Sequence, residues 1–186
     1  MTLCFYFISK NMSLKELTAE KHKQAESTQF MRAIFAGTLP MDHWIDYTYQ
    51  KMLFYKTIEG AAGMNGLLRD LPDISRSFKL FHDYHIMNAD KKQYSFKNAA
   101  VDYHNYLLSI NKDPAKIMAH LYVWHMGDLY GGQMIKRLIP GSHIAFEFEN
   151  KDQLISTIRS KLDDSMADEA NLAFDWAIRI LQEYDV

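Results

Sequence analysis

The architecture of this chain follows from one segment, Gly127-Asp128-Leu129-Tyr130-Gly131-Gly132. The segment lies within residues 115–138, whose apolar spacing otherwise predicts a helix. Each glycine inside a helix costs about 1 kcal/mol relative to alanine, so core packing alone does not explain three glycines among six residues. Bare backbone allows a ligand to approach the helix closely, or allows the helix to bend. We therefore expect a flat ligand against this backbone, with the Asp128 carboxylate beside it.

Most of the remaining chain also has the apolar spacing of helices, interrupted by only 4 prolines and 8 glycines. Ser13 and Glu16 form a capping-box pattern, which predicts a long first helix that ends near Phe35. Pro40 precedes a second helix, for which Asp42 is a candidate N-cap. Further helices are expected over residues 74–87, 98–108, 113–140, 152–163 and 168–184, with a loop at 60–73 and one weak strand candidate at 144–148.

These elements predict an all-α fold, a single-domain helical bundle over residues 13–186, preceded by an N-terminal arm or leader at residues 1–12. The composition, 48% hydrophobic and 24% charged with a net charge of -2, is ordinary for a soluble domain and gives no reason to expect a nucleic-acid partner. Cys4 is the only cysteine, which excludes a disulfide and a thiolate metal cluster. No apolar run approaches the roughly 20 residues that span a bilayer, so we expect a soluble, cytoplasmic protein without a membrane partner.

A second candidate site lies in the first predicted helix, where Lys15, His22 and Glu26 share one face. A histidine can bind a metal through one ring nitrogen while a carboxylate holds the other. Taken alone, this pattern is more typical of a solvated helix surface. A di-metal carboxylate site would need Glu-x-x-His pairs, and the sequence has none. One histidine ligand suits a haem better than a zinc or di-iron centre.

The two segments together resemble the haem oxygenase family. Residues 14–26, followed by Phe30-Met31-Arg32, resemble the family's proximal segment, and residues 127–133 resemble its Gly-Asp-Leu-Ser-Gly-Gly-Gln signature. They occur in the family's order, and residues 168–174 are similar to its last helix. The resemblance implies a helical bundle of the haem oxygenase type. The small size is similar to soluble forms from photosynthetic microbes and their viruses.

The resemblance also implies residue roles. His22 would be the iron ligand and Glu26 its hydrogen-bonding partner. Asp128 would organise distal water. The remaining residues implied by position are Gly127 and Gly131, which let the helix lie close over the haem; Gly132 beside the cofactor; Tyr55 and Tyr122, which match family tyrosines; and Lys15 and Arg159, which would pair with the propionates.

Four positions depart from the family pattern. Trp124 replaces an arginine of the distal network, and its indole N–H can donate one hydrogen bond but carries no charge. His125 replaces a tyrosine and Tyr130 a serine, while Ile155 stands where the family often has a propionate-binding lysine. The distal network and the propionate contacts are therefore where this chain differs most.

The activity implied by the resemblance uses haem b as both cofactor and substrate. It opens the porphyrin to biliverdin, with the IXα isomer as the family default, and releases CO and iron. O₂ is consumed and electrons come from an external donor such as ferredoxin, because no flavin or nicotinamide fingerprint is present. A bilin reductase could take the product.

Three alternatives remain open. A non-catalytic haem carrier or sensor is consistent with the departures at Trp124 and Tyr130. A different small-molecule enzyme, such as a thiamine-degrading hydrolase, would want a nucleophilic cysteine in a pocket, for which Cys4 is badly placed. A purely structural helical protein leaves the clustered glycines unexplained.

Overall fold

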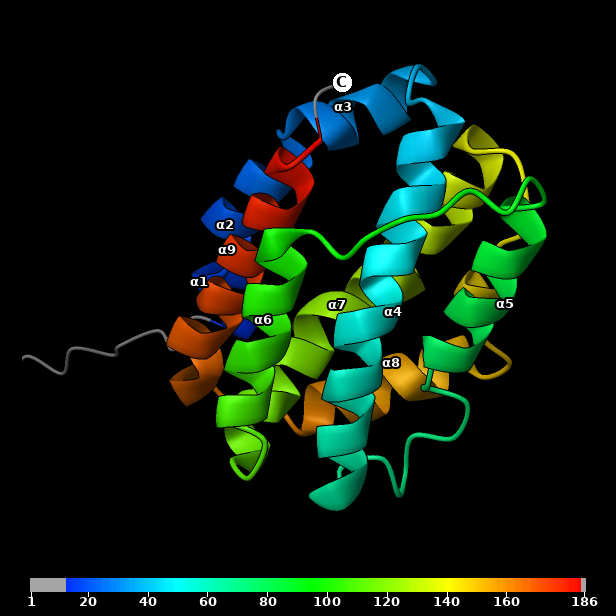
Figure 1. Cartoon of the computed structure of the whole chain (residues 1–186). Helices are drawn as coiled ribbons and strands as arrows, with labels where there is room; N and C mark the ends of the chain where they lie inside the picture. Colours follow the sequence, from blue (N-terminus) through cyan, green and yellow to red (C-terminus); the bar gives the residue numbers. More distant parts are fainter. Residues whose placement is uncertain (1–12, 185–186) are drawn as a thin grey trace, which may run out of the picture.

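A computed structural model of the protein describes residues 13–184, and the described part contains helices and turns but no strand (Figure 1). The predicted all-α class is confirmed. The weak strand candidate at 144–148 was wrong, because a 3-10 turn occupies its start. The predicted arm at residues 1–12 lies outside the described residues.

The elements are α1 (Leu14–Leu17), α2 (Ala19–Glu26), α3 (Gln29–Ala36), α4 (Met41–Met64), α5 (Ser77–Met87), α6 (Asn98–Ser109), α7 (Pro114–Leu138), η1 (Ile144–Phe146), α8 (Lys151–Ser160), η2 (Asp164–Met166) and α9 (Ala167–Gln182).

The predicted first helix is divided into α1, α2 and α3. The capping box at its start is present, since the Glu16 carboxylate accepts hydrogen bonds from the Ser13 backbone N–H at 2.8 Å and from the Ser13 hydroxyl at 3.0 Å. The Thr18 hydroxyl then donates to the Leu14 carbonyl at 2.9 Å, and Thr28 caps α3 by accepting from a backbone N–H. Hydroxyl side chains that bond to nearby backbone groups compete with continuous helix, which explains both breaks.

Two other predicted boundaries were also wrong. The helix α4 runs through Gly60 and Gly63 to Met64 instead of ending at residue 60, because the buried Ile58, Ala61 and Ala62 keep that face against the core. Its N-cap is Pro40, so Asp42 lies in the first turn and is not the cap.

The helix α5 begins at Ser77 rather than at Ile74. The chain before it passes through Asp73, which has a positive φ of 58°. The Arg76 side chain then donates to the Ile74 carbonyl at 3.1 Å and to the Glu147 carbonyl at 2.7 Å. These bonds hold the preceding segment in a non-helical conformation.

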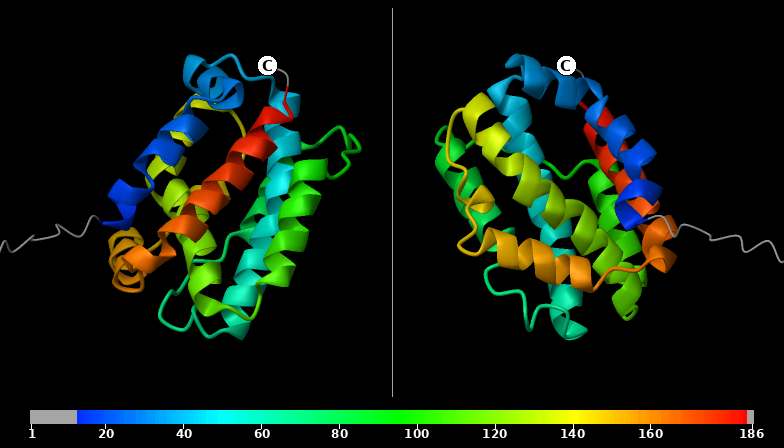
Figure 2. Two further views of the ribbon diagram at one scale, coloured as in Figure 1. Left: turned by 90° about the vertical axis from the view of Figure 1, so that its left-hand side faces the viewer. Right: turned by 180° about the vertical axis from the view of Figure 1, so that it is seen from behind.

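The long helices form two groups, which α6 and α7 join. Helix α4 packs against α5, α6 and α7, while α9 packs against α2, α6 and α7. Figure 2 shows α7 running diagonally across one face of the bundle, where it packs against α8 and α9. Helix α7 is continuous from Pro114 to Leu138, so the glycine segment does not interrupt it. The glycine segment is thus presented on a regular helix in the middle of the fold.

The turn η1 packs directly onto α7. The buried Asp83 carboxylate holds η1 by accepting from the Ile144 and Ala145 backbone N–H groups, each at 2.9 Å. Phe146 then lies so close to α7 that a Cβ added to Gly132 would come within 2.8 Å of the phenyl ring. Gly132 is therefore required for the close packing of η1 against α7.

This packing predicts opposite effects for two helical glycines. Gly132→Ala should destabilise the fold by about 1–3 kcal/mol, because a well-packed core must shift to admit the methyl group. Gly60→Ala should stabilise it by up to about 1 kcal/mol, because a Cβ at Gly60 would meet no atom within 4 Å and alanine is the better helix former. Urea unfolding of both variants measures the difference. Equal effects of the two substitutions would contradict the packing role of Gly132.

Candidate functional site

The two segments singled out in the sequence lie on the same side of the molecule. Both α2 and α7 pack against α9. The Asn171 amide of α9 donates to the Leu17 carbonyl at 3.3 Å, which anchors the chain just before α2. Tyr122 of α7 is next to Thr18: burial raises the pKa of the phenol, and the Thr18 hydroxyl and Arg159 oppose that effect. The start of α2 therefore meets the middle of α7.

Helix α2 is unusual in having no buried side chain. His22 is about half exposed, with its ring edge against Phe174 of α9 at 5.6 Å between ring centroids. The Glu26 carboxylate lies 3.7 Å from Nδ1 of His22, a distance that one small shift or one water molecule converts into a hydrogen bond. The opposite nitrogen, Nε2, makes no hydrogen bond to any described residue. His22 is thus held on one side and free to bind on the other.

Lys15, one of the predicted propionate partners, is exposed in α1, the short helix directly before α2. Its ammonium group makes no hydrogen bond or ion pair with another residue of the described part of the chain, and only its backbone carbonyl accepts a bond, from the Thr18 hydroxyl at 3.5 Å.

The three glycines of α7 have two different surroundings. A Cβ added at Gly127 or at Gly131 would meet no heavy atom within 4 Å, and these positions are one helical turn apart on the same face. Gly132 is buried against Phe146 instead. The contact with Phe146 gives Gly132 a packing role, and its expected contact with a cofactor stays a prediction. Gly127 and Gly131 form a bare strip of backbone that has open space beside it.

Asp128 projects from the same turn of α7 towards α4. Its side chain is 9% exposed. Oδ2 accepts a hydrogen bond from the Tyr55 hydroxyl at 2.6 Å, and Oδ1 lies 2.9 Å from the Lys51 ammonium. Burial and the charge of Asp128 raise the pKa of Tyr55 well above its usual value, so the phenol is a hydrogen-bond donor at neutral pH. The structure thus joins two of the predicted site residues, Tyr55 and Asp128, by a direct hydrogen bond.

Lys51 was not among the residues that the sequence singled out. A signal existed, since Lys51 falls one turn from both Tyr47 and Tyr55 on the wide apolar face of its helix. A charged residue on such a face usually has a buried partner.

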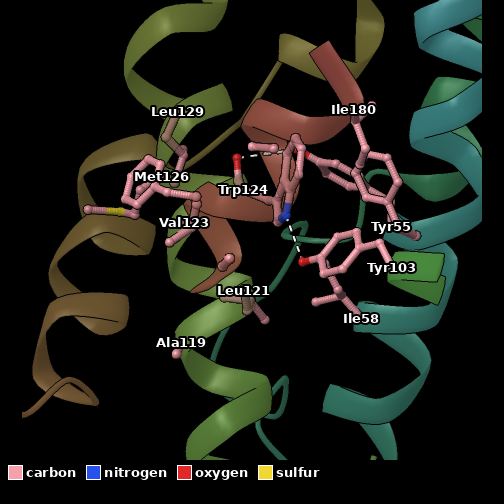
Figure 3. Packing of buried hydrophobic residues seen from close by; sticks show 14 of the residues in the cluster. Tyr55, Ile58, Tyr103, Ala119, Leu121, Val123, Trp124, Met126, Leu129 and Ile180 are labelled. Atoms are coloured by element: carbon pink, nitrogen blue, oxygen red, sulfur yellow. Dashed lines mark hydrogen bonds between the residues drawn. The ribbon is translucent and has the colours of Figure 1, made fainter. Parts of the chain in front are cut away.

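Trp124 connects this site to a second buried network. Figure 3 shows its indole N–H pointing at the Tyr103 hydroxyl, at 2.8 Å, while its carbonyl accepts from Tyr55 at 3.2 Å. The Tyr103 hydroxyl lies 2.7 Å from Nδ1 of His120, whose Nε2 lies 2.9 Å from the Glu169 carboxylate. This geometry fits a neutral His120 that accepts from Tyr103 and donates to Glu169. Trp124 is thus held by hydrogen bonds and cannot supply a charge to Asp128.

His125, on the next position of α7, pairs with Glu59 of α4. Its Nε2 lies 3.2 Å from the Glu59 carboxylate, which also accepts from the backbone N–H groups of Arg76 and Ser77. Burial alone would raise the pKa of Glu59, but the hydrogen bonds from His125 and these backbone groups outweigh it and lower the pKa. The histidine that stands here in place of the family's tyrosine is therefore paired with a buried carboxylate, that of Glu59.

Arg159 lies at the other end of the glycine segment. Its guanidinium donates to the Tyr130 hydroxyl at 2.8 Å, and the Lys151 ammonium lies 5.7 Å from the centre of the Tyr130 ring. These three side chains border an open hollow of about 570 Å³ between α7 and α8, which Ile155 also lines. Asp152 also lines the hollow, so its charged lining consists of two cations and one carboxylate, and the excess positive charge with the Tyr130 hydroxyl suits an anionic group. Lys151, one turn before Ile155, was missed because it does not match the family's position.

Metal-ligating side chains are otherwise dispersed. Within residues 13–184 no group of three His, Cys, Asp or Glu side chains lies close enough together to hold a metal ion. A haem iron needs only one protein ligand, and its flat ring needs a bare surface. His22 and the strip at Gly127 and Gly131 fit those two requirements.

The fold and site together define an all-α bundle in which a strip of bare helix backbone is supported from behind by buried polar pairs. Comparison with known proteins identifies the class. The sequence model of the family described as "Heme oxygenase" matches residues 9–151. The chain belongs to the haem oxygenase family, whose reaction opens haem to biliverdin with release of CO and iron.

Individual relatives agree with this assignment. The haem oxygenase of Guillardia theta is 26% identical over 96% of this chain and 88% of its own length. Haem oxygenase 2 of Mus musculus is 25% identical over 92% of this chain, which spans only 64% of that longer protein. The solved haem oxygenase of Leptospira interrogans superposes with a TM-score of 0.80 at 25% identity, covering 93% of this chain and 100% of that one.

Haem oxygenase-2 of Synechocystis, solved in complex with haem and NO, has the same fold, with a TM-score of 0.79 at 23% identity over 91% of this chain and 82% of that one. None of the helices described here has the length and apolar character that crossing a membrane requires.

The buried His120 network predicts a pH-dependent stability. Burial lowers the pKa of His120, so below the ordinary histidine pKa of about 6.5 the unfolded chain takes up a proton that the folded chain does not. The free energy of unfolding should therefore fall as the pH is lowered from 7 to 5, by up to about 1.4 kcal/mol per pH unit for this one proton. Urea unfolding as a function of pH measures this slope.

His120→Gln should reduce the slope, because glutamine does not titrate. His82→Gln is the matched control, since His82 is exposed on α5 and the slope should be unchanged. If the wild-type slope persisted in His120→Gln, another group would have to be responsible for it.

Proposed function

We propose that this chain opens haem b oxidatively to biliverdin, CO and iron, with the haem held between α2 and α7. The observation that carries the proposal is the bare strip at Gly127 and Gly131, which has open space in front and the buried Asp128 beside it. Each glycine in a helix costs stability, and packing accounts for Gly132 alone. A flat ligand against this strip accounts for the other two.

His22 is the proposed iron ligand. Its free Nε2 would bind the iron, while Glu26 near Nδ1 fixes the tautomer and makes the ring a better ligand. Because α2 has no buried side chain of its own, a bound haem would cover a surface that the protein otherwise leaves exposed. A thiolate ligand would donate electron density to the iron and favour O–O cleavage. A neutral imidazole donates less, so it does not favour that cleavage in the same way.

Bound haem supplies both the iron at which O₂ is reduced and the porphyrin that is oxidised. The residues of α7 then act around it. Asp128, oriented through Oδ2 by Tyr55, keeps lone pairs free to hold a water molecule and to pass a proton towards the open face. Gly127 and Gly131 allow the backbone to lie against the ring. We further propose that Tyr122, packed against Thr18, keeps the two haem-contacting helices at a fixed separation.

Arg159 and Lys15 are the proposed partners of the haem propionates. Arg159 already presents its guanidinium at the hollow beside Tyr130, and Lys15 is exposed in α1 on the side of α2. Two cations at the ring edge would fix its rotation and therefore the meso carbon that is attacked, for which we propose the α position. Electrons would come from an external donor, for which we propose ferredoxin, and a bilin reductase could take the product. We also propose that the protein acts as a soluble cytoplasmic enzyme.

One experiment separates this proposal from its alternatives. Haemin is added to the purified protein with a reductant under air, and the Soret band is followed. Replacement of the Soret band by the spectrum of biliverdin supports the enzyme. A stable Soret band would indicate a haem carrier or sensor, and the absence of any Soret shift would contradict haem binding altogether.

The proposed iron ligand predicts a spectroscopic change. His22→Ala should lose the spectrum of imidazole-ligated ferric haem, and added free imidazole should restore it, because the substitution leaves a space at the iron. His82→Ala, an exposed histidine on α5, is the control and should keep the wild-type spectrum. An unchanged spectrum in His22→Ala would show that the iron is bound elsewhere.

The bare strip predicts opposite effects on the free and the loaded protein. Gly127→Ala and Gly131→Ala should each raise the stability of the haem-free protein by up to about 1 kcal/mol, because the new methyl group meets no atom within 4 Å. The same substitutions should weaken haem binding, because the methyl group occupies the surface that the ring needs. Gly60→Ala, which also meets no atom, should stabilise without changing haem affinity. Unfolding curves and haemin titration provide the two measurements, and unaltered haem affinity in both strip variants would refute the role of the strip.

A further inference from the structure

The ion pair between Lys51 and Asp128 is one of the most deeply buried pairs of opposite charge in the described structure. The side chains are 4% and 9% exposed, and the ammonium lies 2.9 Å from Oδ1. Lys51 is the only basic side chain within 4 Å of this carboxylate among residues 13–184. The two residues are 77 positions apart and join α4 to α7.

The surroundings of Lys51 are aromatic. Its ammonium lies 4.8 Å from the centre of the Tyr55 ring and 5.1 Å from that of Phe146. Such contacts favour a cation, since the ring faces carry partial negative charge. A small, partly open space of about 10 Å³, lined by Lys51, Trp44 and His143 among others, has room for about one water molecule. The site is therefore built around a buried ammonium group.

The structure gives a reason for a cation at this position. Trp124, one turn before Asp128 on α7, uses its only side-chain donor on Tyr103 and carries no charge. Its backbone carbonyl accepts from Tyr55. His125, the other polar side chain in that turn, pairs with Glu59, so the ion pair of the Asp128 carboxylate is made with Lys51 of α4.

Stability alone is a weak explanation for this pair. Replacing a buried ion pair by apolar residues of similar volume is often neutral or stabilising, because desolvation costs as much as the attraction returns. The core around Lys51 already contains Trp44, Tyr47 and Phe146, to which an apolar side chain would add without difficulty. The pair lies next to the bare strip at Gly127 and Gly131. This position indicates instead that the pair sets the orientation and the charge balance of the Asp128 carboxylate.

We propose that Lys51 is a positioning residue for the haem-opening reaction. It fixes the rotamer of Asp128 through Oδ1 and balances its charge, so that with Tyr55 on Oδ2 the remaining lone pairs are aimed at the haem face. This proposal rests on the proposed function of the same site. It assigns to α4 the positive charge that the arginine position on α7 does not provide in this chain.

The first test uses the haem-free protein. A double-mutant cycle compares the unfolding of Lys51→Met, Asp128→Asn and the double variant. Each single change leaves a buried group without its partner, so the double variant should lose less stability than the sum of the singles, by roughly tenfold in the unfolding equilibrium constant. Lys56→Met, an exposed lysine on the same helix, should show no coupling to Asp128→Asn. Additive effects at Lys51 would overturn the proposal.

The second test uses the haem complex. Lys51→Met should bind haem within about threefold of wild type but form biliverdin at least roughly tenfold more slowly, whereas Lys51→Arg, which keeps the charge, should recover most of the rate. The pH midpoint of the ferric haem spectrum should rise in Lys51→Met, because removing the ammonium leaves a net negative charge near the iron, and Lys51→Arg should restore it. A wild-type rate of biliverdin formation or an unshifted midpoint in Lys51→Met would overturn the proposal.

The two proposals fail in different ways. If the wild-type protein binds haem but forms no biliverdin, the proposed function fails, while the cycle and the spectral midpoint still test Lys51. If biliverdin forms normally in Lys51→Met, the function stands and the role of Lys51 is refuted.

Discussion

The contact between α4 and α7 through the Asp128 carboxylate is the interaction on which the rest of the site depends. Lys51 and Tyr55 both reach it from α4, at 2.9 Å and 2.6 Å. Each acts from a buried position, where hydrogen bonds are strong and unpaired groups are costly. The carboxylate therefore fixes the rotation of α7 about its own axis. That rotation in turn decides that Gly127 and Gly131 face open space.

The faces of helix α7 differ in what they contact. On the sides that meet α4 and α9 it carries buried polar groups, with His125 paired to Glu59 and His120 paired to Glu169. On the strip at Gly127 and Gly131 it has no side chains at all. A helix that loses packing on one face must be held more firmly on the others. The directional hydrogen bonds of the buried pairs supply that support in a way that apolar contacts, which can slide, do not.

The sequence alone predicted what depends on helical periodicity and on local chemistry. The all-α class, the pairing of His22 with Glu26 and the shared face of Gly127 and Gly131 all follow from residues three or four positions apart. It failed where tertiary contacts decide. The packing of Phe146 against Gly132 could not be predicted, because only the tertiary fold brings these two residues together. Lys51 was missed because its partner is 77 positions away, and no local rule connects them.

The position of Trp124 shows how a site can keep its electrostatics while its residues change. The indole adds apolar surface to the core and donates to Tyr103, but an uncharged group leaves the carboxylate on α7 without a nearby cation. Lys51 brings a positive charge to it from another helix, at a point where three aromatic rings lie within about 6 Å of the ammonium. Coulomb attraction depends on distance and surroundings rather than on which helix supplies the charge. A cation on α4 can therefore act on the Asp128 carboxylate as well as one on α7 could, provided that it lies as close as Lys51 does.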